Sequence, residues 1–429
     1  MGQPFDMPAY WLAVWWGLWV GQALWCWYNA NLFARRLCKQ QTPEGAADRD
    51  RYEPTAVVIV PVKGAGDRLE EHVAAMAGQA YPRYRLVYVV ESKGDPAVAV
   101  IERAMASSGG ASGGPAWQIV EAGVSVDEGQ KVHNLRRGLA AATAGGPTDG
   151  DGGGSAEVLV FADADAVPGP AWLGRMVFPL RREGTGATTG YRWMAPTDDR
   201  LASRVVSVMN GSVATLLGPD RRNHAWGGSM AIRRSLADEI DLDGYWRGAL
   251  SDDFQMTRAI RESGKRLYFV LRNLLPSPVS MSWGGLLEFG RRQYMITRVH
   301  APWVWLTGLL ATGGYTGAWL SAVVFVAAGV GGGAGGWGWA AGAGAVVAFA
   351  DAQRGRCRAK AVRAVMPEEV MARLGPALRL DRWATPMVMA VHFFVVLSSA
   401  FGRTLDWAGV RYRLRGRQRV EVVGRRRSR

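Results

Sequence analysis

The sequence predicts an α/β domain with a largely parallel sheet, joined at both of its ends to membrane-spanning helices. Two observations lead to this fold class. Between residues 55 and 300, short β-branched apolar runs alternate with helix-like stretches, which is the pattern of a parallel sheet covered by helices. Before and after this region lie long apolar runs that contain many of the 19 Trp residues, and Trp concentrates where a helix meets a membrane surface.

The first predicted element is an N-terminal transmembrane helix over residues 10–33. This run carries no charge, and at ~1.5 Å per residue it crosses a hydrocarbon core of ~30 Å. No basic region precedes it, which favours an anchor over a cleaved signal peptide. The basic residues Arg35, Arg36 and Lys39 follow it, so we expect the N-terminus outside and the next domain in the cytoplasm, at the inner membrane if the source is bacterial.

The central region, residues 55–300, is predicted to be one cytoplasmic domain. Its first strand is TAVVIVP at 55–61, a β-branched apolar run that Pro ends. Further strands are expected at 85–91, 157–161 and 265–270, and helices at 69–79, 95–107, 132–144 and 251–263. The loops 108–116 and 145–155 are rich in small and turn-forming residues, and we interpret them as insertions.

The C-terminal part, residues 302–402, is predicted to hold two or three membrane segments and a basic interfacial stretch at 354–382. If all three C-terminal segments crossed the membrane in addition to the N-terminal helix, the basic tail, residues 403–429, would lie outside the cell, against the positive-inside rule. We therefore expect one segment to be re-entrant or interfacial. The candidate segments are residues 302–329, 336–350 and 383–402.

The formal net charge of +14 is compatible with nucleic-acid binding or with attraction to a membrane surface. Its position favours the membrane, because the tail from residue 403 holds ten Arg against Asp406 and Glu421 and follows apolar segments. We expect no nucleic-acid partner. The three cysteines, Cys26, Cys38 and Cys357, show neither metal-ligand spacing nor a disulfide framework, which indicates a reducing compartment.

The strongest single motif is Asp163-Ala164-Asp165, directly after the predicted strand 157–161. The carboxyl end of a strand is where ligands bind in a parallel α/β sheet. If the strand continued, both carboxylates would point the same way and could hold a divalent cation that bridges a diphosphate. The alternative is a solvated turn.

Two helix starts carry further polar groups. Asp252 and Asp253 open the predicted helix 251–263, where one carboxylate could act as a general base or simply favour the positive end of the helix. Lys131 and Asn134 lie at the start of the helix predicted at 132–144. They could hold a phosphate or a nucleoside, or form an ordinary first turn.

Six segments occur in an order that is more informative than any one of them. They are VIVPVKG (58–64), AYPRYRLVYVVESKGDPA (80–97), GQKVHNL (129–135), FADADAVPGPAWL (161–173), GGSMAIRR (227–234) and SDDFQMTRAI (251–260). Over about Val57 to Pro302 this order resembles family 2 glycosyltransferases, specifically the ceramide glucosyltransferase branch. One motif departs: the family's membrane-proximal Gln-x-x-Arg-Trp is reduced to Gln293, with Arg298 slightly later.

The resemblance implies a GT-A, Rossmann-like domain that binds a nucleotide sugar. It further implies inverting transfer of a hexose, expected to be glucose, from a UDP-sugar to a lipid hydroxyl such as that of ceramide. By the same resemblance, Asp253 is the general base, Asp163 and Asp165 bind Mg²⁺ or Mn²⁺, and Glu91 lies near the uracil and ribose. The other expected substrate contacts are Pro61, Lys63, Lys131, Asn134, Asp163, Gly228, Asp252, Gln293 and Arg298.

Two other functions stay open on the sequence. The acceptor could be a polyprenyl phosphate or a glycan, although the reduced Gln293 motif argues against a processive polysaccharide synthase. The chain could also be a catalytically inactive membrane protein that binds sugar nucleotides, but all three acidic elements are present. A transporter is disfavoured, because the central domain is soluble in character and no span carries a clear ionisable pathway.

Overall fold

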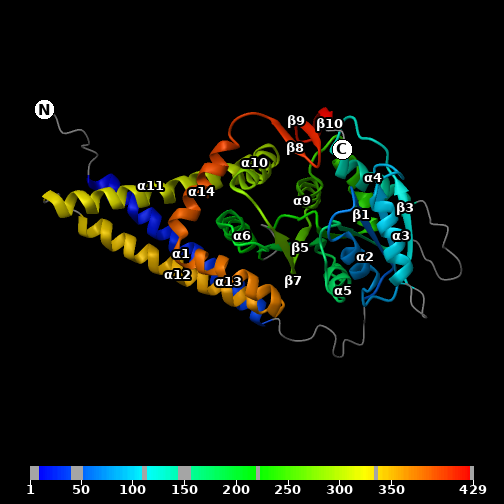
Figure 1. Cartoon of the computed structure of the whole chain (residues 1–429), viewed down its shortest axis with the longest axis horizontal. Coiled ribbons are helices and arrows are strands. Elements are labelled where there is room, and N and C mark those ends of the chain that lie inside the picture. Colours follow the sequence, from blue (N-terminus) through cyan, green and yellow to red (C-terminus); the bar gives the residue numbers. More distant parts are fainter. Residues whose placement is uncertain are drawn as a thin grey trace. The chain divides into compact units, whose positions relative to one another are not determined.

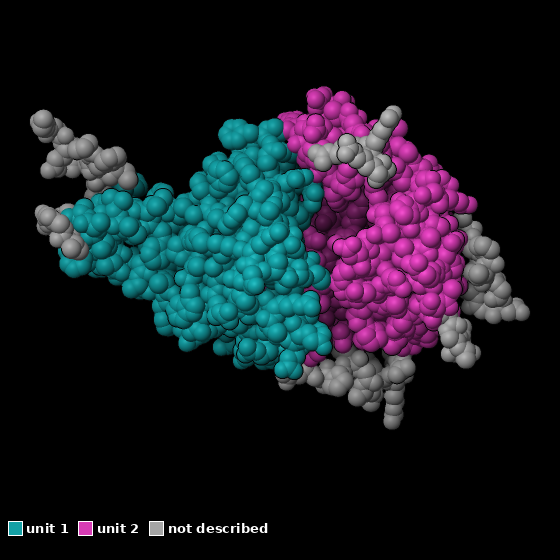
Figure 2. All heavy atoms as spheres, in the orientation of Figure 1, with its two compact units in different colours: residues 1–42, 194–216, 278–402 teal, residues 43–193, 217–277, 403–429 magenta. Residues whose placement is uncertain are grey.

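The computed structural model describes residues 9–39, 52–108, 114–143, 156–218, 223–332 and 337–425. The chain divides into two compact units, which Figure 2 shows in different colours. Unit 1 comprises Met1–Thr42, Met194–Leu216 and Pro278–Gly402 and is mainly helical. Unit 2 comprises Pro43–Trp193, Leu217–Ser277 and Arg403–Arg429 and contains the sheets.

Unit 2 is built around a seven-stranded sheet with the order β3-β2-β1-β4-β6-β5-β7. Figure 1 labels β1, β3, β5 and β7 of this sheet. β1 pairs in parallel with β2 and β4, and β2 pairs in parallel with β3, whereas β6 is antiparallel to β4 and β5. The strands are β1 (Ala56–Pro61), β2 (Tyr84–Val90), β3 (Ala116–Glu121), β4 (Val158–Ala162), β5 (Thr185–Pro196), β6 (Ser229–Arg233) and β7 (Arg266–Val279).

The central strands are buried on both faces, because helices cover each side of the sheet. Val58 and Val60 of β1 share one core with α2, α3 and α5. Val57 and Ile59, which point the other way, share a second core with α4, α7, α8 and α9. The helices of unit 2 are α2 (Leu69–Ala77), α3 (Ala97–Ser108), α4 (Gln130–Thr143), α5 (Trp172–Val177), the 3₁₀ helix η1 (Phe178–Arg181), α7 (Arg234–Glu239), α8 (Leu242–Trp246) and α9 (Asp252–Glu262).

The last part of the chain forms a second, antiparallel sheet in unit 2. Its strands are β8 (Thr404–Trp407), β9 (Val410–Gly416) and β10 (Arg419–Arg425), in the order β10-β9-β8. β9 reads VRYRLRG, and its Val410, Tyr412 and Leu414 are buried. The alternation of apolar and Arg residues matches the two-residue period of a strand with one buried face.

Unit 1 consists mainly of long helices. They are α1 (Ala9–Lys39), α6 (Leu201–Ala214), α10 (Trp283–His300), α11 (Pro302–Gly332), α12 (Trp337–Arg363), α13 (Glu368–Trp383) and α14 (Thr385–Ser398). α1, α11 and α12 pack on one another through an apolar core that includes Trp19, Tyr315 and Val347. α12 is also joined to α13 by buried ion pairs, with Asp381 accepting from Arg354 and Arg358 at 3.3 and 2.9 Å.

One helix within the described ranges is long and apolar enough to cross a membrane. It covers Pro302–Gly329 of α11, with a mean hydropathy of 1.5. α13 and α14 meet the same criterion only as a pair, and the chain bends by 93° between them. The expected N-terminal span at 10–33 lies within α1, which is long enough to cross a membrane but is not apolar enough to meet the criterion. The expected segment 336–350 overlaps α12, which is also long enough but not apolar enough.

The predicted α/β class with a mostly parallel sheet is confirmed. The four expected strands correspond to β1, β2, β4 and β7, and the four expected helices correspond to α2, α3, α4 and α9. β7 extends nine residues beyond its expected end at 270, to Val279. Most of the two loops interpreted as insertions, 108–116 and 145–155, lies outside the described residues.

Candidate active site at the carboxyl edge of the sheet

Three strand ends bring charged residues to one edge of the sheet. β1, β2 and β4 are parallel, so their carboxyl ends lie at the same edge. Lys63 comes shortly after β1, Glu91 directly after β2 and Asp163 directly after β4. The chain passes from β1 to β2 and β3 on one side and then returns to place β4 on the other side of β1. Such a reversal of strand order is where open α/β sheets bind their ligands.

A half-buried lysine joins two of the predicted acidic elements. Lys131 lies in the first turn of α4, and its Nζ is 2.6 Å from Asp163 Oδ1 and 3.0 Å from Asp252 Oδ2. Burial alone would lower the pKa of Lys131, but the two carboxylates outweigh it and raise that pKa above its ordinary value. Lys131 therefore stays charged and holds the ends of β4 and α9 together.

The loop before β6 packs directly on this ion-pair cluster. A Cβ on Gly227 would lie 2.3 Å from Asp252 Oδ2 and 2.5 Å from Lys131 Nζ, so a larger residue there would displace these two side chains from their ion pair. A Cβ on Gly228 would lie 2.2 Å from the Trp226 ring. The expected substrate contact Gly228 thus lies in a tight turn next to the ion-pair cluster.

Asp252 and Asp253 have different environments at the start of α9. Asp252 is buried, and burial together with the nearby Asp253 and Asp163 charges raises the pKa of its carboxyl to about 6, against the opposing effect of Lys131. Asp253 is only half-buried. Its Oδ1 accepts hydrogen bonds from the Ser251 hydroxyl and from the Phe254 N–H. Asp252 is therefore held in the ion-pair cluster, whereas Asp253 keeps part of its side chain exposed.

The Asp163-Ala164-Asp165 segment offers hard oxygen ligands at the end of β4. Asp163 is half-buried and Asp165 is exposed. The loop is supported from below by His72, whose Nδ1 donates to the Ala166 carbonyl at 2.6 Å. Burial lowers the pKa of His72 to about 4, so this support is a neutral imidazole.

The same two carboxylates are chemically suited to Mg²⁺ or Mn²⁺, which prefer carboxylate oxygens. Asp163 is already paired with one positive charge, the Lys131 ammonium at 2.6 Å. Within the described ranges, no group of three or more His, Cys, Asp and Glu side chains is arranged as a metal site. Two carboxylates alone would have to share the ion with a ligand such as a diphosphate.

Several expected substrate contacts have partners within the protein. Asn134 is 3% exposed, accepts from Gln130 Nε2 at 2.9 Å and donates to the Val89 carbonyl at 3.2 Å, so it joins α4 to β2. Pro61 is the last residue of β1. In unit 1, Gln293 and Arg298 lie on α10, and the Arg298 guanidinium donates to the carbonyls of Ala400 and Gly402.

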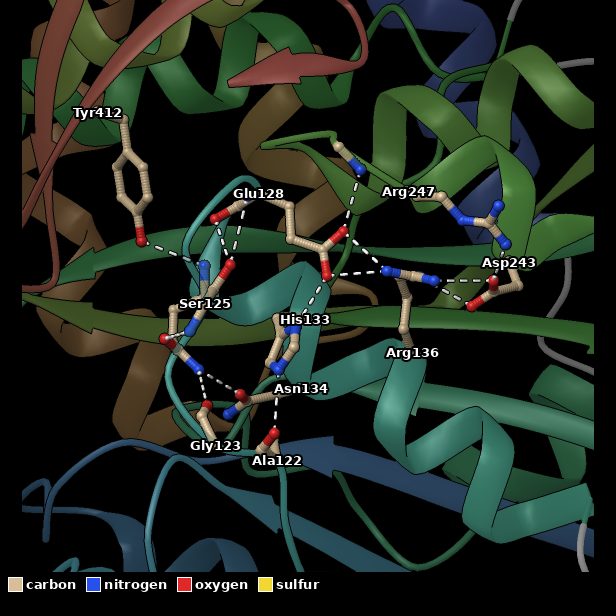
Figure 3. A network of polar contacts seen from close by, with 12 residues as sticks. Ala122, Gly123, Ser125, Glu128, His133, Asn134, Arg136, Asp243, Arg247 and Tyr412 are labelled. Carbon is tan, nitrogen blue, oxygen red and sulfur yellow. Dashed lines mark hydrogen bonds and ion pairs between the residues drawn. The ribbon is translucent and has the colours of Figure 1, made fainter. Parts of the chain in front are cut away.

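A network around Glu128, which none of the sequence motifs includes, fixes the start of α4 (Figure 3). Glu128 is 1% exposed, and both its oxygens accept from Arg136 Nη1 at 3.0 Å. One oxygen also contacts His133 Nδ1 at 2.8 Å, and the other accepts from the Gly248 N–H at 3.0 Å. Arg136 in turn donates to both oxygens of Asp243. The only sign of this network in the sequence is an acidic residue, Glu128, directly before the Gly129-Gln130-Lys131 turn.

These contacts give Glu128 a perturbed pKa. Burial alone would raise it, but the hydrogen bonds from His133 and Gly248 and the Arg136 charge outweigh burial and hold the pKa of Glu128 below its ordinary value. The ionised carboxylate therefore anchors the helix turn that carries Lys131.

Fold and site together are typical of an α/β enzyme, with acidic groups and a half-buried lysine beyond the carboxyl ends of parallel strands. The family comparison specifies the class further. The model of glycosyl transferase family 21 matches residues 17–420, which is most of the chain. The chain therefore belongs to glycosyltransferase family 21, and it is a hexosyltransferase.

Among solved structures, the chain is similar to the mannosyltransferase PcManGT from Pyrobaculum calidifontis in complex with GDP-Man and Mn²⁺. The two are 16% identical, with a TM-score of 0.46, over 91% of this chain and 97% of the other. It is also similar to glucosyl-3-phosphoglycerate synthase from Mycobacterium tuberculosis in complex with Mg²⁺ and uridine-diphosphate, at 15% identity and a TM-score of 0.37, over 58% of this chain and 80% of the other. No curated relative matches the chain.

Proposed function

We propose that this family 21 glycosyltransferase is a membrane enzyme with a GT-A domain that transfers glucose from UDP-glucose to the hydroxyl of a lipid such as ceramide, with inversion at the anomeric carbon. The observation that carries the proposal is the cluster of Lys131, Asp163 and Asp252 at the carboxyl edge of the sheet, with Asp253 beside it. This is the place where an α/β sheet binds a nucleotide, and it combines a fixed positive charge with a carboxylate that an acceptor can reach.

Asp253 is the proposed general base. The lipid hydroxyl attacks the anomeric carbon, its proton passes to the Asp253 carboxylate, and the bond between the sugar and the diphosphate breaks with the electron pair leaving on the diphosphate oxygen. Asp252 is less suited to this step, because it is buried against Lys131. The Ser251 hydroxyl and the Phe254 N–H orient Asp253 for proton transfer.

Asp163 and Asp165 are the proposed holders of Mg²⁺ or Mn²⁺, which when bound would stabilise negative charge on the diphosphate. Lys131 supplies further positive charge at the same edge, and its two ion pairs keep it in place without the donor. Electrostatic groups fixed before the reaction stabilise developing charge at no cost of reorganisation.

The membrane part of the proposal is supported by apolar side chains that unit 1 leaves exposed. On α11, Trp303 is 78% exposed and Leu310 is 65% exposed; on α12, Trp339 is 81% exposed. Exposed large apolar residues of this kind mark a surface that contacts lipid or another protein. Together with the apolar length of α11, they favour insertion in a bilayer, where a lipid acceptor would be available.

The fold of the C-terminus also constrains the membrane topology. Residues before and after the segment Pro278–Gly402 belong to the same compact unit, so both lie on one side of any membrane. The chain between them must then cross an even number of times. This favours the expectation that one C-terminal segment does not cross, and the broken pair α13 and α14 is the candidate, since it bends by 93°. The basic residues that follow the N-terminal helix, Arg35 and Arg36, and the Arg-rich segment 403–429 favour a cytoplasmic location for unit 2 by the positive-inside rule.

The test is to incubate membranes that contain the protein with radiolabelled UDP-glucose, UDP-galactose or GDP-mannose, and to extract and separate the lipids. We expect label from UDP-glucose in a glycolipid, increased by added ceramide and absent with an Asp253→Asn variant. Label in a polyprenyl-linked product or in a water-soluble glycan would move the acceptor to the alternative class. The absence of transfer from every donor, with a folded protein, would contradict catalysis.

A further inference from the structure

The C-terminal sheet is attached near the carboxyl edge of the main sheet by contacts between residues far apart in the sequence. Tyr412 of β9 is 2% exposed, and its hydroxyl accepts from the N–H of Gln130, the first residue of α4, at 3.1 Å (Figure 3). Gln255 of α9 donates through Nε2 to the Arg417 carbonyl at 2.9 Å. The sheet therefore contacts the two helices that carry Lys131 and the Asp252–Asp253 pair.

The backbone of the turn between β9 and β10 packs closely on the segment after α8. Gly248 has a φ of +71°, and a Cβ there would lie 2.5 Å from the Gln418 carbonyl oxygen. The side chain of Gln418 donates to the Gly244 carbonyl at 2.7 Å. A close approach that requires glycine, with a hydrogen bond beside it, indicates a specific docked position of the sheet.

Arg425, at the end of β10, reaches Glu91 at the carboxyl edge of the main sheet. Its Nη1 is 2.9 Å from Glu91 Oε2, and its Nη2 donates to the Ser125 carbonyl and to Gln130 Oε1, both at 2.8 Å. One guanidinium thus links the residue directly after β2, the loop before α4 and the first residue of α4. Charge-assisted bonds of this length are among the stronger hydrogen bonds in proteins.

Glu91 is held from a second side as well. Lys63, after β1, has its Nζ 4.0 Å from Glu91 Oε2 and donates to the Ala408 carbonyl of the C-terminal sheet at 2.8 Å. The Glu91 side chain nevertheless remains 23% exposed. It is therefore a carboxylate of fixed orientation with part of its surface free to accept from a ligand at the carboxyl edge.

We propose that Arg425 is a positioning residue for the nucleotide donor, and that the C-terminal sheet completes the donor site. Arg425 orients Glu91, which would accept hydrogen bonds from the hydroxyls of a nucleoside ribose, and holds the start of α4, from which Lys131 extends. The inference rests on the proposed function, because it takes the ligand at this edge to be a nucleoside diphosphate sugar.

The experiment compares three variants of the full-length protein in detergent: Arg425→Ala, Arg425→Lys and the control Arg419→Ala. Arg419 lies on the same strand and is exposed, so its loss removes the same charge at the surface. UDP binding is measured by calorimetry, and transfer is measured over a range of UDP-glucose concentrations. We expect Arg425→Ala to weaken UDP binding and raise the donor KM by roughly 10-fold or more, with kcat changed much less, because ground-state positioning is lost.

Arg425→Lys should restore binding only in part, because an ammonium lacks the planar fork that reaches Glu91 and Gln130 together. In a Glu91→Gln background, Arg425→Ala should have a smaller effect, because the part of its action that passes through Glu91 is already lost and only its contacts at the start of α4 remain. The thermal unfolding of each variant is recorded, and the partial rescue by lysine and the non-additivity with Glu91 separate positioning from a loss of folding.

Two outcomes overturn the inference in distinguishable ways. If wild-type protein binds UDP and Arg425→Ala binds it equally well, with an unchanged donor KM, the C-terminal sheet has no part in donor binding and the proposed function stands. If wild-type protein binds no UDP, the proposed function fails and the inference fails with it.

Discussion

The Glu128 network provides a quantitative test of how the site is held. In Glu128→Gln, one oxygen becomes an NH₂ group, so the side chain can no longer accept from Arg136, His133 and Gly248 together. We expect the variant to fold with reduced stability. The fully hydrogen-bonded carboxylate is replaced by an amide, whose NH₂ group would face N–H groups that need an acceptor.

The magnitude follows from the contacts. Removing one partner of a buried ion pair costs about 3–5 kcal/mol when the other charge is left uncompensated. Here Arg136 keeps Asp243, at 2.8 and 3.0 Å, and is 22% exposed. We therefore expect a loss of about 2–3 kcal/mol, which for a domain of about 150–250 residues lowers Tm by roughly 5–10 °C.

The assay is thermal unfolding of the full-length protein in detergent at several pH values, with Glu239→Gln as the control, since Glu239 is an exposed carboxylate. The pKa of Glu128 is lower in the folded state than in the unfolded state, so its contribution is present at neutral pH and is lost as pH falls through the folded pKa. The difference in Tm should thus shrink below about pH 4. A variant that unfolds at the wild-type temperature at pH 7 would refute the stabilising role of the network.

Three further predictions concern the chemistry. Excess chelator should abolish transfer, as should Asp165→Ala with an unchanged Tm; full activity in chelator would exclude the metal. Asp253→Asn should reduce turnover by ~10²–10⁴-fold with UDP binding retained, whereas Asp252→Asn should reduce it less; the reverse order in single-turnover measurements would exchange their roles. Gly227→Ala should weaken UDP binding in calorimetry, because its Cβ would displace Lys131 or Asp252; wild-type affinity would show that the loop can move aside.

The parts of the fold that the sequence predicted are those with strong local signals. β1, β2 and β4 are runs of β-branched and apolar residues, and their burial on both faces is what such runs predict. The acidic residue after β4 was recognisable for the same reason, since a carboxylate directly after a buried strand lies at the sheet edge. β5 reads TGATTGYRWMAP and carries no comparable signal, because its Gly and Thr residues are buried by packing that only the tertiary structure supplies.

The C-terminal sheet was missed for a different reason. The ten Arg residues of the segment 403–429 favoured its interpretation as a basic tail, although Val410, Tyr412 and Leu414 alternate with Arg in β9. A search for the two-residue period would have found this strand. The ion pairs of Lys131 with Asp163 and Asp252 were beyond the sequence, because their partners come from three separate elements that only the sheet topology brings together.

The docking of the C-terminal sheet leads to a final prediction about topology. Because β8–β10 and the main sheet belong to one compact unit, residues on both must be accessible from the same side of a membrane. Cys26, Cys38 and Cys357 are free cysteines and can be replaced by Ser, and single cysteines can then be introduced as Glu239→Cys in the main part of unit 2 and Arg419→Cys in the C-terminal sheet.

In sealed right-side-out vesicles, an impermeant maleimide should label neither introduced cysteine, and in inverted vesicles it should label both. This outcome requires an even number of crossings between Pro278 and Gly402, and it places the donor site in the cytoplasm. Labelling of both in right-side-out vesicles would reverse the orientation but keep the even number. Labelling of the two cysteines from opposite sides would require an odd number of crossings. The docked C-terminal sheet could not then form in the membrane, and the contacts of Arg425 with Glu91 and Gln130 would be lost with it.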